Sequence, residues 1–435
     1  MNKLFNEILS EKELRYLWYC NLGIEDVWKN KKLSVFSNYR LRNIEEICIF
    51  LARKEDVILC RERPDKNYLS YLSTLNFNIP NFFSLDDITS ESLIESVEIN
   101  RHRIINQLKN EEYIVVPYSY DQNIDRIVEE CSLQWLYKVS DVKHFNDKIW
   151  INRIMKDNGI LCPESFEGHG EDDIANKCKQ LFSMTNTGGV VLKKIFGASG
   201  KGNYLIKDIR QLKSIMRIFL EDEKNILIEK YYNEAENFSY QIYIQENGNI
   251  DVFFISKQIV KGMVYKGTEF GRDVFEEPLK KEIKEEGLNV GSILYKNGIR
   301  GIVGVDGIYA GGKIYPSIDV NVRFTMATYL SKITSIIGEE KYFCAIISDV
   351  STYKCFEYEE ILLKLEHEKL LYVPEKGSGI LVYISGTLPR YKDKKLNKYL
   401  GRIYALIVGD SEKHYIELKG KYDRFLGGLG MNEYK

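Results

Sequence analysis

A hairpin signature around Gly311-Gly312 constrains the fold of this chain more than any other feature. Two apolar runs, Ile302–Tyr309 and Lys313–Val322, flank this pair of glycines, which fits a two-residue hairpin loop. In the register that such a loop sets, Asp319 lies opposite Gly304. We therefore predict that Asp306 and Asp319 are diagonal neighbours on one face, with Cβ atoms roughly 7 Å apart.

The same face of the hairpin carries further polar groups. Asn321 and Arg323 follow Asp319 at alternate positions, and alternate side chains of a strand share a face. Carboxylates on a buried face are costly, and Mg²⁺ relieves that cost because it prefers carboxylate and carbonyl oxygens completed by phosphate and water. The pattern predicts a magnesium site at Asp306, Asp319 and Asn321. A surface hairpin with an ordinary ion pair between Asp319 and Arg323 is the alternative.

A glycine-rich stretch after an apolar strand predicts a phosphate-binding loop. The strand Val190–Leu192 leads into Lys193 and then into a loop that lets backbone N–H groups approach phosphate oxygens. The spacing is not that of a P-loop, because only two residues separate its first two glycines and no hydroxyl residue follows its lysine. A solvated glycine-rich turn is the alternative. The loop residues concerned are Gly197, Ser199, Gly200, Lys201 and Gly202.

A third pattern, Glu229-Lys230-Tyr231-Tyr232, ends an apolar strand that begins near Ile226. The backbone of such a hinge can bond the edge of an adenine ring, and Glu236 or Glu234 just beyond it can reach ribose hydroxyls. An ordinary strand end would have the same sequence pattern.

The chain divides into three predicted parts, 1–140, 141–335 and 336–435. The first alternates short buried strands with helices, which is typical of a Rossmann-like α/β layer, but it lacks a GxGxxG fingerprint. The second holds a helix capped by Asn146 or Asp147 and a second hairpin at Asn247-Gly248. The predicted strands are 34–36, 57–60, 113–117 and 379–384, and the predicted helices are 42–53, 87–108, 122–131, 147–157, 357–370 and one near 392–407, before a loose C-terminal end.

Composition excludes several classes of function. The 61 Lys and Arg residues balance 63 Asp and Glu residues, which argues against a nucleic-acid partner held by bulk charge. The eight cysteines are scattered without a CxxC pair, so a zinc site is not expected. The start lacks the features of a signal peptide and there is no apolar run of about 18 residues, so we expect a cytoplasmic protein without a membrane span.

In this order, the patterns resemble the ATP-grasp superfamily. Lys148, at the start of a helix that leads to Asn158-Gly159, resembles the first lysine of these enzymes, and Lys193 with its loop resembles the strand lysine and phosphate loop. The thirteen-residue step from Asp306 to Asp319 matches D-alanine–D-alanine ligase. An aspartate stands at the second acidic position where the family usually has glutamate, which leaves open whether one or two Mg²⁺ ions bind.

The run Asp319–Met326 further resembles peptide ligases of the pheganomycin-biosynthesis type. This resemblance implies an α/β (α+β) fold with a pre-ATP-grasp domain over 1–140. The ATP-grasp core would have a nucleotide lid at about 160–230 and a metal and substrate part at about 231–335, followed by a small C-terminal α+β domain. It implies ATP and Mg²⁺ as cofactors and an ADP-forming carboxylate–amine ligase of peptide or specialised-metabolite biosynthesis. The substrates would be small molecules, amino acids or peptides, with a carrier-bound acyl group as an option. Apart from the resemblance, a homodimer is a candidate state because dimers are the commonest oligomers.

The resemblance also suggests roles for single residues. Lys148 and Lys193 would contact the α- and β-phosphates, the 197–202 loop the β- and γ-phosphates, and Arg323 the acyl phosphate. Lys257 and Arg300 are candidates for further catalytic cations. The segment 261–276 is expected to form a substrate-facing lid whose Arg272 meets a carboxylate, with a plain mobile loop as the alternative.

Three other functions remain open at this stage. An ATP-grasp kinase would stop at a phosphorylated product, and a nucleotide-binding scaffold would turn over no ATP. A nicotinamide-dependent oxidoreductase would use the N-terminal α/β layer, but the layer lacks the glycine fingerprint that binds such cofactors.

Overall fold

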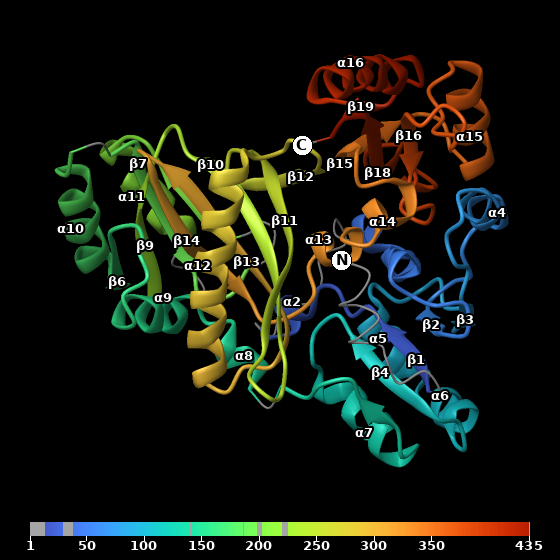
Figure 1. Ribbon diagram of the computed structural model, residues 1–435, viewed down its shortest axis with the longest axis horizontal. Helices are drawn as coiled ribbons and strands as arrows, with labels where there is room; N and C mark the ends of the chain where they lie inside the picture. Colours follow the sequence, from blue (N-terminus) through green and yellow to red (C-terminus); the bar gives the residue numbers. More distant parts are fainter. Residues whose placement is uncertain are drawn as a thin grey trace.

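The computed structural model describes residues 14–28, 38–139, 141–185, 187–197, 202–219 and 225–434. Three parts surround a central region (Figure 1): an N-terminal α/β layer, a small four-stranded sheet with its helices, and a large sheet that runs into the C-terminal part. None of the helices in the described residues is long and apolar enough to cross a membrane.

The N-terminal part is a parallel sheet with strand order β3-β2-β1-β4-β5 among the described residues. Its strands are short apolar runs covered on both faces, which is why they do not alternate polar and apolar residues. The predicted strands at 57–60 and 113–117 are confirmed, and the one at 34–36 lies outside the described residues. The strands are β1 (Arg15–Tyr19), β2 (Val57–Cys60), β3 (Asn81–Ser84), β4 (Tyr113–Pro117) and β5 (Gln134–Trp135).

Short helices connect these strands. The helix expected over 42–53 is a shorter 3-10 helix at Ile44–Phe50, and the stretch 87–108 holds two helices instead of one, because Asn100 ends the first and precedes the second. The α-helices are α2 (Ile24–Trp28), α3 (Asn38–Leu41), α4 (Lys66–Thr74), α5 (Leu93–Ile99), α6 (Arg101–Leu108) and α7 (Gln122–Glu130).

The small antiparallel sheet has strand order β6-β9-β7-β8 and packs one face against α10 and α11. Leading into it, α9 begins at Lys148 because the Asp147 carboxylate accepts the backbone N–H groups of Ile149 and Trp150, at 2.8 and 3.0 Å. The elements are α8 (Val142–Phe145), α9 (Lys148–Asp157), β6 (Ser165–His169), α10 (Gly170–Phe182), β7 (Gly189–Lys194), β8 (Asn203–Ile206), α11 (Leu212–Phe219) and β9 (Asn225–Tyr231).

The large sheet is continuous from the middle of the chain into its C-terminal part, with strand order β14-β13-β10-β11-β12-β15-β18-β16 in the described residues. Both predicted hairpins are present, and both glycines of Gly311-Gly312 have positive φ, as their turn requires. The strands are β10 (Glu236–Ile244), β11 (Ile250–Lys261), β12 (Val264–Gly271), β13 (Gly301–Ala310), β14 (Lys313–Asn321), β15 (Tyr342–Thr352), β16 (Gly379–Val382) and β18 (Lys398–Gly409), with β17 (Tyr391–Asp393) and β19 (Asn432–Glu433) at its margins.

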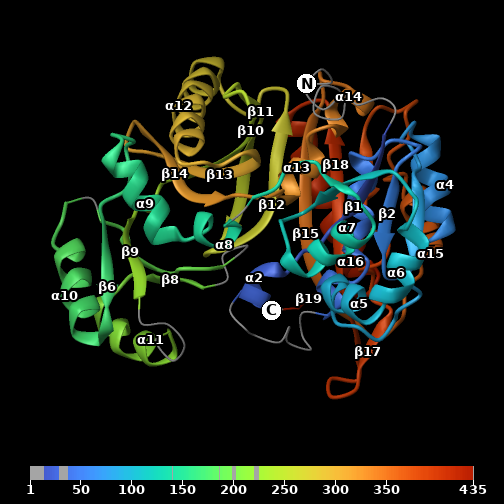
Figure 2. The ribbon, with the colours of Figure 1, turned by 90° about the horizontal axis from the view of Figure 1, so that it is seen from below.

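Helices cover this sheet unequally. The long α12 lies across β10 and β11 (Figure 2), and its apolar residues join theirs in one core, so the opposite face of these strands is the one available to a ligand. The helices are α12 (Glu277–Lys296), α13 (Met326–Leu330), α14 (Ile333–Ile337), α15 (Tyr358–His367) and α16 (Glu412–Gly428).

Two predictions for the C-terminal part are wrong. The helix expected near 392–407 is the strand β18, which pairs along its length with β15, because a short continuous apolar run suits a buried strand as well as a buried helix. The C-terminal segment that we expected to be loose, from Arg424 onward, contains the last residues of α16, and Tyr422 and Phe425 of this helix are buried. The helix at 357–370 and the strand at 379–384 are confirmed with slightly shorter bounds.

The N-terminal and C-terminal parts share one hydrophobic core. Tyr68 of α4 donates a hydrogen bond to the Tyr383 carbonyl at 2.8 Å, and Tyr71 donates to the Tyr372 carbonyl at 2.6 Å. The domain boundaries at 140 and 335 stay a prediction, although the sheet and this core both continue across them.

Candidate active site

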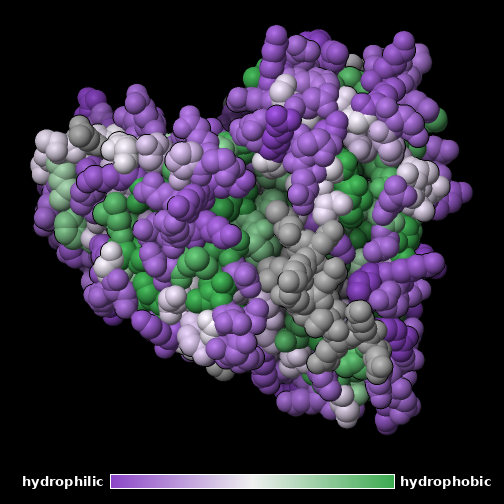
Figure 3. Space-filling view, viewed as in Figure 1, coloured by the Kyte–Doolittle hydropathy of each residue, from purple (hydrophilic) through white to green (hydrophobic). Residues whose placement is uncertain are grey.

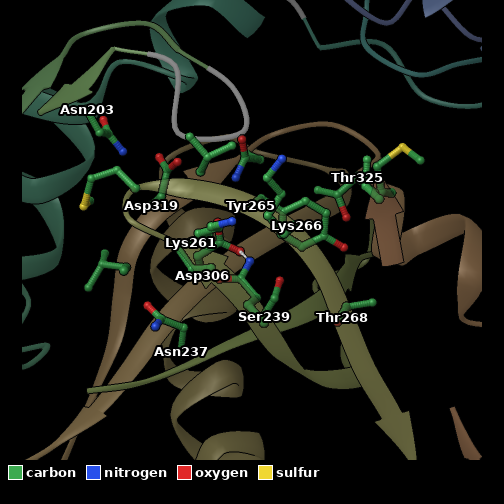
Figure 4. Close-up of a pocket in the computed structure, with 18 of the residues that line it drawn as sticks. Asn203, Asn237, Ser239, Lys261, Tyr265, Lys266, Thr268, Asp306, Asp319 and Thr325 are labelled. Carbon is green, nitrogen blue, oxygen red and sulfur yellow. Dashed lines mark hydrogen bonds between the residues drawn. The ribbon is translucent and has the colours of Figure 1, made fainter. Parts of the chain in front are cut away.

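A cavity of about 670 Å³ lies where the small sheet, the large sheet and the N-terminal part meet, a volume in the usual range for ligand sites. The outline of the molecule is notched between its two upper arms, and hydrophilic side chains line that notch (Figure 3). Figure 4 shows Asp306, Asp319, Tyr265 and Lys266 gathered in the cavity, with Asn203 and Thr325 on either side.

Asp306 and Asp319 face each other directly across β13 and β14, which corrects the diagonal arrangement that we expected. The pairing begins as predicted, with Ala310 opposite Lys313, but an irregularity between Asp306 and Ile308 shifts it by two residues. Two residues restore the same face, so both carboxylates still point into the cavity.

This carboxylate pair is electrostatically unfavourable without a cation. Burial and the negative charge of Asp319 raise the pKa of Asp306 from 3.8 to about 6. The Lys148 ammonium contacts the Asp319 carboxylate, and Gln258 donates a hydrogen bond to Asp306 at 2.8 Å. No group of three or more His, Cys, Asp or Glu side chains forms a metal site in the described part of the chain, so the Asn321 amide is the candidate third ligand. Two facing carboxylates and an amide oxygen fit Mg²⁺.

The predicted phosphate lysines both reach this region. Lys148 opens α9 and is buried, and Lys193 on β7 is buried as well. The Lys193 ammonium contacts the Glu229 carboxylate and donates a hydrogen bond to the Ile318 carbonyl at 2.9 Å. The small sheet therefore contacts the strand that carries Asp319 through a lysine.

The predicted hinge forms another part of the cavity wall. Glu229, Lys230, Tyr231 and Tyr232 all contribute to its wall, at the end of β9 and just beyond. The Tyr232 hydroxyl lies 3.0 Å from Glu164 Oε2 and 2.9 Å from the Tyr315 hydroxyl, and these contacts fix its ring.

Arg323 is held by the N-terminal part of the chain, which the sequence patterns did not predict. Glu25 Oε1 lies 2.7 Å from Arg323 Nε, and Arg323 Nη1 lies 2.5 Å from the Tyr118 hydroxyl. Arg323 Nη2 also donates to Asn321 Oδ1 at 2.8 Å. The guanidinium is thus fixed beside the candidate metal ligand Asn321 by residues from two distant segments.

Besides Lys148 and Gly197, which line a small recess next to the cavity, and Gly202 of the phosphate loop, four predicted site residues do not line the cavity. Lys257 pairs with Glu236 at 3.1 Å, and both lie on the face of the sheet turned toward α12, because Phe238 opposite Lys257 packs in the core under that helix. Arg300 donates to the carbonyls of Tyr295 and Ile299, outside the cavity wall.

The fourth is Arg272, whose Nε lies 3.0 Å from Asp273 and whose side chain is 60% exposed. The lid expected at 261–276 is mainly the end of β11 and the strand β12, and it turns Tyr265 and Lys266 into the cavity instead of Arg272.

Only part of the predicted phosphate loop is described. Gly197 lines a small recess next to Lys148 and Arg323, and Gly202 accepts a hydrogen bond from the Lys194 backbone at 2.9 Å. Ser199, Gly200 and Lys201 lie outside the described residues.

The cavity also contains residues that no motif indicated. Lys266, Asp349 and Arg402 lie on three adjacent strands, and Gln258 lies beside Asp306. Gln258 could have been predicted from the Asn247-Gly248 hairpin, because it alternates with Ser256 along one strand. Arg402 could not, because the sequence pattern near 392–407 was interpreted as a helix.

Known proteins match this chain in sequence and in fold. Residues 145–327 match the family described as the ATP-grasp domain. The [butirosin acyl-carrier protein]–L-glutamate ligase of Niallia circulans is 23% identical over 325 residues, which are 72% of this chain and 73% of that protein.

Solved structures show the same architecture along nearly the whole chain. A biotin carboxylase–β-γ-ATP complex from Campylobacter jejuni is 12% identical, with a TM-score of 0.58 over 96% of this chain and 92% of that one. A phosphoribosylamine–glycine ligase from Thermotoga maritima is 13% identical, with a TM-score of 0.52 over 93% and 96%. The sequence match therefore assigns residues 145–327 to the ATP-grasp domain family, and these solved structures share the fold of the chain.

Proposed function

We propose that this protein is an ATP- and Mg²⁺-dependent ligase that joins a carboxylate to an amine through an acyl phosphate. The direct pairing of Asp306 with Asp319 carries this proposal, because it lies in one cavity with Lys193 and the hinge, and because the Lys148 ammonium contacts Asp319. The Niallia circulans relative is by its name an acyl-carrier protein–glutamate ligase, which supports amide formation with an amino acid.

The chain supplies positioning and charge for two transfers. In the first, a substrate carboxylate oxygen attacks the γ-phosphorus of ATP, the bond to the β-phosphate oxygen breaks, and ADP leaves. In the second, an amine nitrogen attacks the acyl carbon, the bond to the phosphate oxygen breaks, inorganic phosphate leaves, and the nitrogen loses a proton. Negative charge accumulates on oxygen in both, so fixed cations are the main contribution that the protein makes.

Each positioned residue has a task in this scheme. Lys148 and Lys193 bind phosphate oxygens of ATP, and the 229–232 hinge binds the adenine edge. Arg323, held by Glu25 and Tyr118, stabilises the oxygens of the acyl phosphate. Asp306, Asp319 and Asn321 would hold Mg²⁺, which supplies neutralisation of phosphate charge when bound.

The substrates follow from the same comparison. We propose an amino acid or peptide as the amine and a small-molecule or carrier-bound carboxylate as its partner. A homodimer stays a prediction that the molar mass in solution would test.

Phosphate and ADP release with Mg²⁺ and a panel of carboxylate and amine pairs tests the proposal, and mass detection of the product separates a ligase from a kinase. We expect Asp319→Ala and Asn321→Ala to lower turnover by about 100-fold. Asp251→Ala is the matched control, because Asp251 lies on β11 outside the cavity. Turnover at the wild-type rate in both site variants would exclude this metal assignment.

A further inference from the structure

The cavity ends in a second cluster of charges on the C-terminal strands. Arg402 on β18 holds Asp349 of β15 with two contacts, Nε at 2.8 Å and Nη2 at 3.2 Å. Lys266 on β12 places its ammonium 3.6 Å from the same carboxylate. We call these three residues the Arg402 cluster, and all three line the cavity.

The register of the sheet shows why these side chains meet. Asp349 is the direct partner of Arg402, and Ile347 is the direct partner of Tyr404. Lys266 stands two residues before Thr268, which pairs with Ala345, so Lys266 shares the face of Asp349. The cluster therefore belongs to the same face of the sheet as Asp306.

The charges in the cluster do not cancel. Two cations surround one carboxylate, which leaves a net positive charge in a wall that is mostly shielded from water, with Lys266 21% and Arg402 19% exposed in their side chains. A purely structural ion pair needs one cation, as the nearby pair of Lys261 and Glu433 illustrates. The third charge requires an anion from elsewhere for balance.

The geometry of the donors selects the kind of anion. Asp349 occupies Nε and Nη2 of Arg402, while Nη1 reaches, among the described residues, only the Tyr404 hydroxyl, at 3.4 Å. A guanidinium N–H beside a lysine ammonium suits the two oxygens of a carboxylate.

The distance between the Arg402 cluster and the Asp306–Asp319 site indicates which substrate carboxylate the cluster would bind. From β13 there are three strand steps of about 4.8 Å to β12, which carries Lys266, and four to β15, which carries Asp349, so the paths along the sheet are about 14 and 19 Å, and twist of the sheet shortens the direct distances. An amino acid used as the amine has a carboxylate of its own, which competes for the γ-phosphate of ATP. Holding that carboxylate on the C-terminal strands keeps it away from the phosphate and leaves the amine to react.

We infer that the Arg402 cluster binds the carboxylate of an amino-acid or peptide amine substrate at the end of the cavity away from the metal site. This inference rests on the proposed ligase function and adds the substrate class of its amine site. It assigns part of the specificity to Asp349 and Arg402, which lie outside the residues that match the ATP-grasp domain, and part to Lys266, which lies within them.

Calorimetric binding to the full-length protein tests this inference. The protein is saturated with Mg²⁺ and a non-hydrolysable ATP analogue, and the probes are the twenty common L-amino acids and their α-carboxamides. We expect at least one acid to bind ten times more tightly than its amide. Arg402→Met and Lys266→Gln should each weaken binding of that acid at least tenfold and remove its advantage over the amide, with affinity for the ATP analogue within twofold of wild type.

Three further variants distinguish recognition from support of the fold. Arg390→Met and Lys354→Gln are matched controls, because both residues form ion pairs in the C-terminal part without lining the cavity, and they should bind the acid as wild type does. Asp349→Asn leaves both cations of the cluster without their carboxylate, so it should bind the acid as tightly as wild type or more tightly. A structural ion pair predicts the opposite, an equal loss in Asp349→Asn and Arg402→Met.

The outcomes separate this inference from the function on which it rests. Equal binding of acids and amides, unchanged binding in Arg402→Met and Lys266→Gln, or no binding of any acid to the nucleotide-loaded protein would overturn the inference alone. Failure to bind the ATP analogue, or no ATP turnover with any substrate pair, would overturn the proposed ligase function instead.

Discussion

The two charged regions on one face of the large sheet are built alike and carry opposite excess charge. At one, Asp306 and Asp319 are direct partners across β13 and β14, so two like charges face each other. At the other, Asp349 and Arg402 are direct partners across β15 and β18, so opposite charges face each other, and Lys266 adds a second cation. The same cross-strand geometry destabilises the first pair and stabilises the second.

The comparison teaches how one face can bind ligands of both signs. The region around Asp306 has more carboxylate than its contacts from Lys148 and Gln258 balance, and it suits a divalent cation. The Arg402 cluster has more cation than carboxylate and suits an anion. Serine and glutamine side chains that are almost fully buried lie in the strands between the two regions, at Ser239, Gln241 and Ser256.

The largest effect is expected when the repulsion between Asp306 and Asp319 is removed. We expect Asp306→Asn to lower turnover by about 100-fold and to raise the Mg²⁺ concentration for half-maximal rate, because one carboxylate ligand is lost. The same variant should melt at the wild-type temperature or above, since the charge opposite Asp319 is gone. A magnesium titration of phosphate release and a thermal melt check both. A variant that loses stability and keeps its magnesium dependence would show that Asp306 is structural.

A smaller effect is expected where the N-terminal part holds the cation beside the acidic region. Glu25→Gln removes the charge that positions Arg323, so we expect turnover to fall by about tenfold, with the KM for ATP nearly unchanged, because Arg323 acts on the acyl phosphate. Steady-state kinetics at saturating and limiting ATP measure this. Glu62→Gln is the matched control, because Glu62 pairs with Arg42 in the same part of the chain. An equal effect in both variants would contradict a role specific to Glu25.

The smallest effect on catalysis is expected for a buried carboxylate outside the cavity. Glu46 accepts hydrogen bonds from Ser385 N at 2.6 Å, Ser385 Oγ at 2.9 Å and Gly386 N at 3.2 Å, which joins the N-terminal and C-terminal parts. Burial raises the pKa of Glu46 from 4.5 to about 7 despite these hydrogen bonds. Glu46→Gln should leave turnover at pH 8 within about twofold of wild type.

The pH dependence of stability is the sharper readout for Glu46. The folded protein holds this proton more tightly than the unfolded chain, so the contribution is full below pH 4.5 and is lost as the pH rises to about 7. The free energy of unfolding of wild type minus that of Glu46→Gln should therefore fall over this range, by about 3 kcal/mol for a shift of this size. Urea denaturation between pH 5 and 7.5 measures it, and parallel curves for the two proteins would exclude the shifted pKa.

Local patterns were sufficient for the elements that carry the metal and phosphate residues. The Gly311-Gly312 and Asn247-Gly248 turns each dictate a hairpin by backbone conformation alone, and Asp147 caps α9 in a way that places Lys148 at its start. Lys193 and the 229–232 hinge could be predicted because each lies at the end of an apolar strand of ordinary length. These signals act over a few residues, so they can be recognised without knowledge of the rest of the chain.

The same reasoning failed where no local sequence signal marks a feature. One such feature is the register shift within the hairpin that sets Asp306 directly opposite Asp319. Lys257 has the right chemistry but lies on the face of the sheet that α12 covers. Arg272 follows the end of β12, where its exposed side chain contacts Asp273 instead of lining the cavity.

The sequence by itself indicated the resemblance to ATP-grasp enzymes and the residues on which the proposed chemistry rests, since hairpin turns, a helix cap and the spacing of aspartates are local properties. The tertiary structure alone decided that Glu25 and Tyr118 hold Arg323, and that Lys266, Asp349 and Arg402 form one cluster. Those contacts join residues far apart in the chain, and strand order and face determine them. Strand order and the identity of the covered face are set only when the strands pair and the helices pack on one side of the sheet. Alternation within one strand shows which residues share a face, but it does not show which other residues that face contacts.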